Sequence, residues 1–306
     1  MPNWQQVLHE TQARKESAQS DAINAADHIR RHYLKKLHNK SQRNVIAYYS
    51  GWLSKQALDS SINDEDKNGF MMCVHKLDRS KGLDLILHTP GGSIAATQSI
   101  VDYLHKMFGD DIRAIVPQIA MSAGTIIACS CKTILMAKHS NLGPIDPQVN
   151  GWPAYGVLQE FKKACREVKS DPSKANVWRA IIGQYKPAFL GQCQDAITWS
   201  NRFVREQLRD VMFKGEPKAT EKAIKIVRWL SSKKQHASHA QHVHADACKK
   251  NGLKIEMIED DDELQDLILT VHHCYMHAFQ STATYKAIEN HLGVGVFKQQ
   301  QAVKVK

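Results

Sequence analysis

Residues 82–137 constrain the fold most, because strand-like and helix-like apolar segments alternate there at short intervals. The strand-like segments are short and rich in branched aliphatic residues, which is typical of buried strands. The first helix-like segment buries one face, since Thr97, Val101, Leu104 and Phe108 recur at helical spacing. This alternation predicts a mostly parallel sheet flanked by helices. The expected strands are "GLDLILHT" (82–89), "IRAIVPQ" (112–118) and "TILMA" (133–137), and the helices follow "TPGG" and "AMS".

The flanking segments suggest how the chain is divided. "RNVIAYYSGWL" (43–53) is the expected first core strand, and the polar, helix-prone residues before it predict an N-terminal helical arm over 1–42. The chain is largely helical from residue 153 onward. "VHADACKKNGLKIEMIE" predicts a helix, a glycine stop and a strand, and "ELQDLILTVHHCYMHAF" predicts a last helix. We therefore expect a main domain over 43–292 and a C-terminal tail over 293–306.

Composition narrows the class of protein. With 306 residues, 42% of them hydrophobic, the chain can bury a sizeable core. No apolar run approaches the roughly 18–20 residues of a membrane helix, and the N-terminus lacks an apolar signal core. The seven cysteines form no CxxC pair, which predicts reduced thiols and no structural zinc. We expect a cytoplasmic protein without a membrane segment.

The net charge of +10 permits contact with nucleic acid or acidic partners. The basic residues gather near the N-terminus and in "SSKK", and no nucleic-acid motif of defined spacing accompanies them. Solvated helix faces explain these charges better than a binding patch does, so a nucleic-acid partner is not expected.

The residues that could take part in a chemical reaction lie in two turns, each of which leads from a strand into a helix. In "HTPGGSI" (88–94), Gly91 and Gly92 let the backbone adopt positive φ and turn free N–H groups toward a ligand. In "AMSAGT", Ser122 stands between small residues that leave room for a carbonyl group. Taken singly, the first turn is equally well explained as a tight turn or as a binding site, and an N-cap is the favoured interpretation of Ser122. Together, on neighbouring parallel strands, they form a site suited to acyl transfer.

The order of these motifs resembles that of a known group. "LDLILHTPGGSI", "IVPQIAMSAGTIIACSCKTILMAKHS" and "NLGPIDPQ" are similar to the Clp-fold serine peptidases, among them the Clp protease proteolytic subunit, signal peptide peptidase A and the NfeD-type peptidases. "MSAGT", "LGPIDPQ" and the late "GLKIEMIEDDDELQDLILTVHHCYMH" are most similar to the serine dehydrogenase proteinase family. The resemblance implies a ClpP/crotonase-like spiral of parallel strands, a homo-oligomer, and hydrolysis of peptide or protein substrates.

The resemblance also implies roles for particular residues. Ser122 matches the nucleophile, while Gly91 or Gly92 and Ala123 match the backbone donors of the oxyanion hole. Removing one such donor typically costs about 3 kcal/mol of transition-state stabilisation. No metal and no organic cofactor is implied.

The general base is harder to assign. No histidine stands where the Clp protease subunit has its own, since Ile145 and Asp146 occupy that place. Lysine is the base in other members of the group, and Lys163 is the candidate here. Asp146 could orient a base or bind substrate, or it could be only a turn residue between two prolines. Lys162, Lys138, Lys186 or a partner subunit could instead supply the base.

The remaining histidines suggest no metal site. "HASHAQHVH" (236–244) and His272, His273 and His277 do not match HExxH, so packed or surface histidines are the favoured interpretation. Two other functions stay open from the sequence. One is a crotonase-type acyl-CoA enzyme, which would use the same oxyanion hole without needing a serine at position 122. The other is a catalytically silent scaffold.

Overall fold

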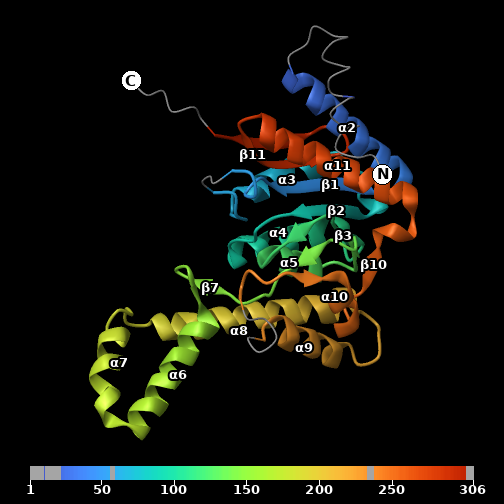
Figure 1. Cartoon of the computed structure of the whole chain (residues 1–306). Coiled ribbons are helices and arrows are strands. Elements are labelled where there is room, and N and C mark those ends of the chain that lie inside the picture. Colours follow the sequence, from blue (N-terminus) through green and yellow to red (C-terminus); the bar gives the residue numbers. More distant parts are fainter. Residues whose placement is uncertain (1–9, 11–21, 56–58, 233–237, 301–306) are drawn as a thin grey trace, which may run out of the picture.

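A seven-stranded sheet forms the centre of the protein. The computed structural model describes residue 10 and residues 22–55, 59–232 and 238–300 (Figure 1). Five neighbouring strands of the sheet are parallel, and the last two are antiparallel to their neighbours. This confirms the predicted mostly parallel sheet flanked by helices. In spatial order the strands are β10 (Ile255–Met257), β5 (Thr133–Met136), β3 (Ile112–Val116), β2 (Leu83–His88), β1 (Asn44–Ser50), β11 (Thr284–Asn290) and β12 (Gly295–Gln299).

The sheet separates two hydrophobic cores, because successive side chains of a strand point to opposite faces. Ile46, Leu85, Ala114 and Ile134 stand side by side in register and belong to the larger core. Helices α3 (Asp66–Val74), α4 (Ile94–Phe108) and α5 (Ala123–Cys129) cover this face of the sheet. The residues that alternate with them pack against α2 (Ala22–Ser41) and α11 (Asp262–Ser281) on the other side (Figure 1).

A helical region follows the central strands. The paired helices α6 and α7 project away from the sheet, while α9 and α10 lie beneath it (Figure 1). Two small sheets connect this region to the centre: β4 and β9 flank β6 in one, and β7 pairs with β8 in the other. Within the described residues, no helix has both the length and the apolar character needed to cross a membrane. The remaining helices and strands are β4 (Ile119–Ala120), β6 (Asn141–Leu142), β7 (Gln148–Val149), β8 (Trp152–Pro153), α6 (Ala154–Ser170), α7 (Ala175–Ile182), α8 (Phe189–Gln207), α9 (Ala219–Leu230), β9 (Val243–His244) and α10 (Ala245–Asn251), with short 3-10 turns η1 (Arg79–Lys81), η2 (Pro172–Lys174) and η4 (Ile258–Asp260) and a π-turn η3 (Leu208–Met212).

The C-terminal part differs from the expected division of the chain. Residues 284–299 form the antiparallel pair β11 and β12, so part of the expected tail belongs to the sheet. The turn between the two strands is made possible by Gly293, which has a φ of 81°. No strand was expected here because β11 carries the charged residues Lys286 and Glu289, both of which are buried.

Candidate active site

The turns after β2 and β4 lie directly against each other. Thr89 and Ala120 form a parallel bridge, with Thr89 N–H donating to Ile119 O and Met121 N–H donating to Thr89 O. Beyond the bridge, Gly91 approaches the serine so closely that a Cβ on it would lie 2.8 Å from Ser122 Cβ. The φ of Gly91, 99°, also favours glycine. The structure therefore brings together the two turns that the sequence suggested would meet.

Ser122 has a strained backbone. It stands at the N-cap position of α5 with φ 50° and ψ −112°, yet its side chain makes no capping hydrogen bond. A non-glycine residue in such a sparsely populated region costs about 1–3 kcal/mol and is characteristic of functional sites. A serine on a strained strand-to-helix turn also presents its hydroxyl outward, as in the nucleophile elbow of hydrolases. The simple N-cap role considered from the sequence is thus not the role that Ser122 has.

Two backbone N–H groups are available next to Ser122. Gly92 pairs with Ile62 in a one-residue parallel bridge that uses the Gly91 carbonyl and the Ser93 N–H, so the Gly92 N–H points away from this bridge. Ala123 is the first residue of α5, where an N–H has no partner within the helix. The Gly91 N–H, by contrast, donates to Thr89 Oγ1 at 3.1 Å. Of the expected oxyanion donors, Gly92 and Ala123 remain available and Gly91 is engaged.

Ser122 opens onto a cleft of about 540 Å³. The "PGG" turn and the first turn of α4 form one wall, and α8 contributes Ala196 and Trp199 to another. This volume lies in the range of about 300–1,000 Å³ that is typical of ligand sites. Its lining residues are Ser61, Pro90, Gly91, Gly92, Ser93, Ile94, Ala95, Ser122, Ile126, Ile145, Pro147, Gln148, Ala196, Trp199 and His239.

No lysine lines this cleft in the part of the chain that the structure describes. Lys163 lies on the projecting helix α6, where its side chain is 60% exposed and its Nζ is 3.8 Å from Glu167 Oε1. Its Nζ also lies 6.0 Å from the centre of the Trp178 ring. The structure therefore does not bring Lys163 to Ser122 within one chain.

Asp146 and His239 stand together at the edge of the cleft. His239 lines both the cleft and a small adjoining pocket, and Asp146 lines that pocket. Burial lowers the pKa of His239, while the Asp146 carboxylate and a hydrogen bond to the Asp146 backbone oppose that shift. A histidine beside a carboxylate, in the same cleft as a serine, has the chemistry of a general base. The described contacts include no hydrogen bond between His239 and Ser122, and such bonds often form only when substrate binds.

The sequence did not single out His239, because packed or surface histidines are a better interpretation of "HASHAQHVH" than a metal site. The first two residues of that stretch lie outside the described residues. His239 comes close to Asp146 because β9, at the end of this stretch, pairs with β6, which directly precedes "GPIDP". As for metals, the described residues contain no group of three or more potential ligands.

The sequence matches a known family over most of its length. A family described as ClpP-like SDH-type serine proteinase matches residues 21–268. The chain belongs to this family, and its fold is the ClpP-like fold that the sequence predicted.

Similar proteins are found in an archaeon. Two uncharacterized proteins of Methanocaldococcus jannaschii are 29% identical over 195 residues, 64% of this chain, and 30% identical over 165 residues, 54% of this chain. The alignments span 60% and 51% of those two relatives. Among solved structures, a mutant of the membrane-bound stomatin-specific protease 1510-N is similar over 68% of this chain and 79% of its own, at 18% identity and a TM-score of 0.38.

Proposed function

We propose that the protein is a serine peptidase in which Ser122 is the nucleophile. The observation that carries this proposal is the backbone of Ser122, which is strained, makes no cap and faces a cleft between two available N–H groups. Strain of this kind persists only where the surrounding structure enforces it. Ser122 Oγ attacks the substrate carbonyl carbon, and the N–H groups of Gly92 and Ala123 stabilise the oxyanion.

We propose His239, which lies beside Asp146, as the general base. His239 takes the proton from Ser122 Oγ as the Oγ–carbon bond forms, and gives it to the amine that leaves when the peptide bond breaks. Water then attacks the acyl carbonyl carbon while His239 accepts a proton from it. The bond between this carbon and Ser122 Oγ breaks, and His239 returns the proton to Ser122 Oγ as the acid product leaves. This assignment is supported by the shared cleft and by the position of Lys163, which lies on α6 outside it.

A serine-reactive fluorophosphonate probe tests the nucleophile. Labelling is expected at Ser122 in the wild-type protein and is expected to disappear in Ser122→Ala. Ser99→Ala is a matched control, because Ser99 lies on α4 outside the cleft, where its Oγ accepts a hydrogen bond from Lys67. Labelling that persists in Ser122→Ala would contradict the assignment.

The same variant separates the alternative functions. A crotonase-type enzyme would turn over acyl-CoA without the serine, so acyl-CoA turnover by Ser122→Ala would exclude the peptidase proposal. A silent scaffold would show neither labelling nor peptide hydrolysis while remaining folded.

Assembly and location remain predictions. We propose a homo-oligomer acting in the cytoplasm on peptide or protein substrates, in keeping with the family and with the composition of the chain. Light scattering after gel filtration tests the oligomer directly.

A further inference from the structure

The segment from Ser60 to Asn63 supports the "PGG" turn from behind. Ile62 N–H donates to Gly91 O at 2.8 Å, and Ser93 N–H donates to Ile62 O at 2.9 Å. The two backbones are so close that a Cβ on Gly92 would lie 2.3 Å from Ile62 N. The position of this segment therefore sets the orientation of the Gly92 peptide, which carries one of the two available N–H groups.

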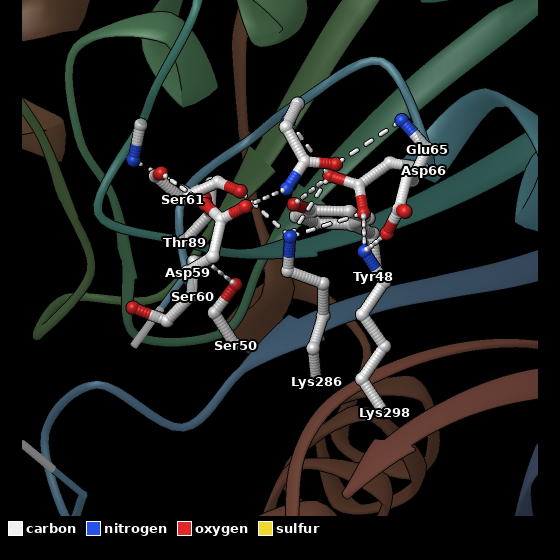
Figure 2. Close-up of polar contacts among 12 residues, drawn as sticks. Tyr48, Ser50, Asp59, Ser60, Ser61, Glu65, Asp66, Thr89, Lys286 and Lys298 are labelled. Atoms are coloured by element: carbon white, nitrogen blue, oxygen red, sulfur yellow. Dashed lines mark hydrogen bonds and ion pairs between the residues drawn. The ribbon is translucent and has the colours of Figure 1, made fainter. Parts of the chain in front are cut away.

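Lys286 lies on β11, the neighbour of β1, and its side chain binds this segment. Its Nζ donates to Ser61 O at 2.6 Å and contacts the two carboxylate oxygens of Asp66 at 3.0 Å and 3.1 Å. The side chains of Lys286 and Asp66 are 1% and 0% exposed. Figure 2 shows the Lys286 amine directed toward Ser61 and Asp66.

Further hydrogen bonds hold the same segment in place. Asp66 Oδ2 accepts hydrogen bonds from Asn63 N–H at 3.1 Å and from Tyr48 Oη–H at 2.8 Å. Ser50 Oγ donates to Ser60 O at 2.7 Å. Backbone groups of Ser60, Ser61, Ile62 and Asn63 are thus all held, two of them by the Lys286–Asp66 pair (Figure 2).

A contribution to stability alone does not explain this pair. Removing two charges from water costs several kcal/mol per ion, and an apolar pair of similar volume is often at least as stable. An apolar pair could not, however, donate to the Ser61 carbonyl or accept from the Asn63 N–H. The pair supplies directional contacts to the same segment that hydrogen-bonds through its backbone to the "PGG" turn.

We infer that Lys286, together with Asp66, is a positioning residue for the oxyanion hole, acting through Ser61 and Ile62 on the Gly92 N–H. The inference rests on the proposed peptidase function. A misplacement of about 1 Å in a catalytic group can cost about 10²-fold in rate. Because the oxyanion forms after substrate binds, the loss belongs in kcat and not in KM.

The decisive variant is the double substitution Lys286→Met with Asp66→Asn. It removes both charges together, which avoids leaving one buried charge unpaired. Lys298→Met is the matched control, because Lys298 also approaches Asp66, at 3.7 Å, but its hydrogen bond goes to Glu65 and not to the segment. Ser50→Ala is a milder second variant that removes the hydrogen bond to Ser60 O.

For the double variant we expect kcat for peptide hydrolysis and the fluorophosphonate labelling rate to fall about 10²-fold, with KM unchanged. Amide hydrogen exchange at Ile62 and Ser93 should accelerate at least about tenfold, while the rest of the sheet stays protected. Ser50→Ala should lower kcat about fivefold, the equivalent of one hydrogen bond. Lys298→Met should retain wild-type kcat.

Three results would overturn the inference. If wild-type Ser122 does not react, the peptidase proposal fails and the inference fails with it. If Ser122 reacts normally in the wild type and both segment variants retain wild-type kcat, the inference alone fails. A loss of kcat in Lys298→Met equal to that in the double variant would also refute it, by showing that the effect is not carried by the contact with Ser61.

Discussion

The chemistry of single residues at this site depends on backbone angles more than on neighbouring side chains. Ser122 lacks a capping bond because its φ of 50° turns the hydroxyl away from the first turn of α5. Gly92, with φ 155°, directs its N–H away from Ile62. Sequence comparison with a family indicates which residue types stand at such positions, but only the structure gives the angles.

The pH dependence of activity distinguishes the two candidate bases. A histidine works as a base only when neutral, and burial lowers the pKa of His239 below its ordinary value of about 6.5. We therefore expect kcat/KM to be near its maximum at pH 7 and to fall as the pH drops through that lowered pKa. His239→Gln should reduce kcat/KM by about 10²–10⁴-fold. Initial rates measured between pH 4.5 and 9 provide the test.

The control is Lys163→Met, which should retain the profile because Lys163 lies outside the cleft. If a lysine were the base, kcat/KM would rise with pH near pH 7–8, where catalytic lysines titrate. A rise of kcat/KM in that pH range that is absent from Lys163→Met would support Lys163 as the base instead of His239.

Among the elements, α2 is attached to the sheet by a buried ion pair. Arg30 Nε donates to Glu289 Oε2 of β11 at 2.7 Å, and the two side chains are 1% and 0% exposed. Tyr275 of α11 donates to the same carboxylate at 3.1 Å. This contact joins the first and last described helices to β11, so the expected N-terminal arm is partly integrated into the domain.

Replacing Arg30 with Met should strongly destabilise the protein. The substitution leaves the buried Glu289 carboxylate without its main partner, and breaking a buried pair in this way costs about 3–5 kcal/mol. Arg31→Ala is the control, because Arg31 also contacts Glu289 but is 45% exposed, so solvent screens its contribution more than that of the buried Arg30. Urea unfolding of the two variants measures the difference. Equal midpoints would show that the Arg30 contact adds little.

The elements that the sequence revealed share one property, which is a mainly apolar run or a clear helical period. Strands β1, β2, β3 and β5 are buried on both faces, so apolar residues dominate their runs, although Asp84 of β2 and Arg113 of β3 are charged. Strand β11 escaped notice because its burial depends on distant partners, Asp66 for Lys286 and Arg30 for Glu289. His239 escaped for a similar reason, since its neighbour Asp146 is remote in sequence.

At the scale of the whole molecule, strand β2 and the turn after β11 contain histidines that cannot readily accept protons. Burial lowers the pKa of His88 to about 4, and its ring lies among Tyr49, Trp52 and His272. Burial, with His38 alongside, also lowers the pKa of His291 to about 4. In the unfolded chain both titrate near 6.5. Between pH 6.5 and 4 the unfolded state therefore binds more protons, so stability is lost as the pH falls through this window.

We expect the free energy of unfolding to fall on acidification from pH 6.5 to pH 4, by up to about 1.4 kcal/mol per pH unit for each such histidine. His88→Gln should flatten this dependence by about one proton, while His75→Gln, which alters an exposed residue, should preserve it. Chemical denaturation at pH 7, 6 and 5 tests both. An unchanged slope in His88→Gln would show that His88 is not one of the groups responsible.

The strain at Ser122 also has an evolutionary consequence. Glycine would adopt the same backbone angles without steric strain, so mutation of this serine to glycine would relieve the strain in the folded state. A lineage that no longer needed the hydroxyl would be expected to drift toward glycine at this position. Retention of the serine in descendants of this chain would therefore indicate continued selection for its hydroxyl group, because backbone stability alone favours glycine at this position.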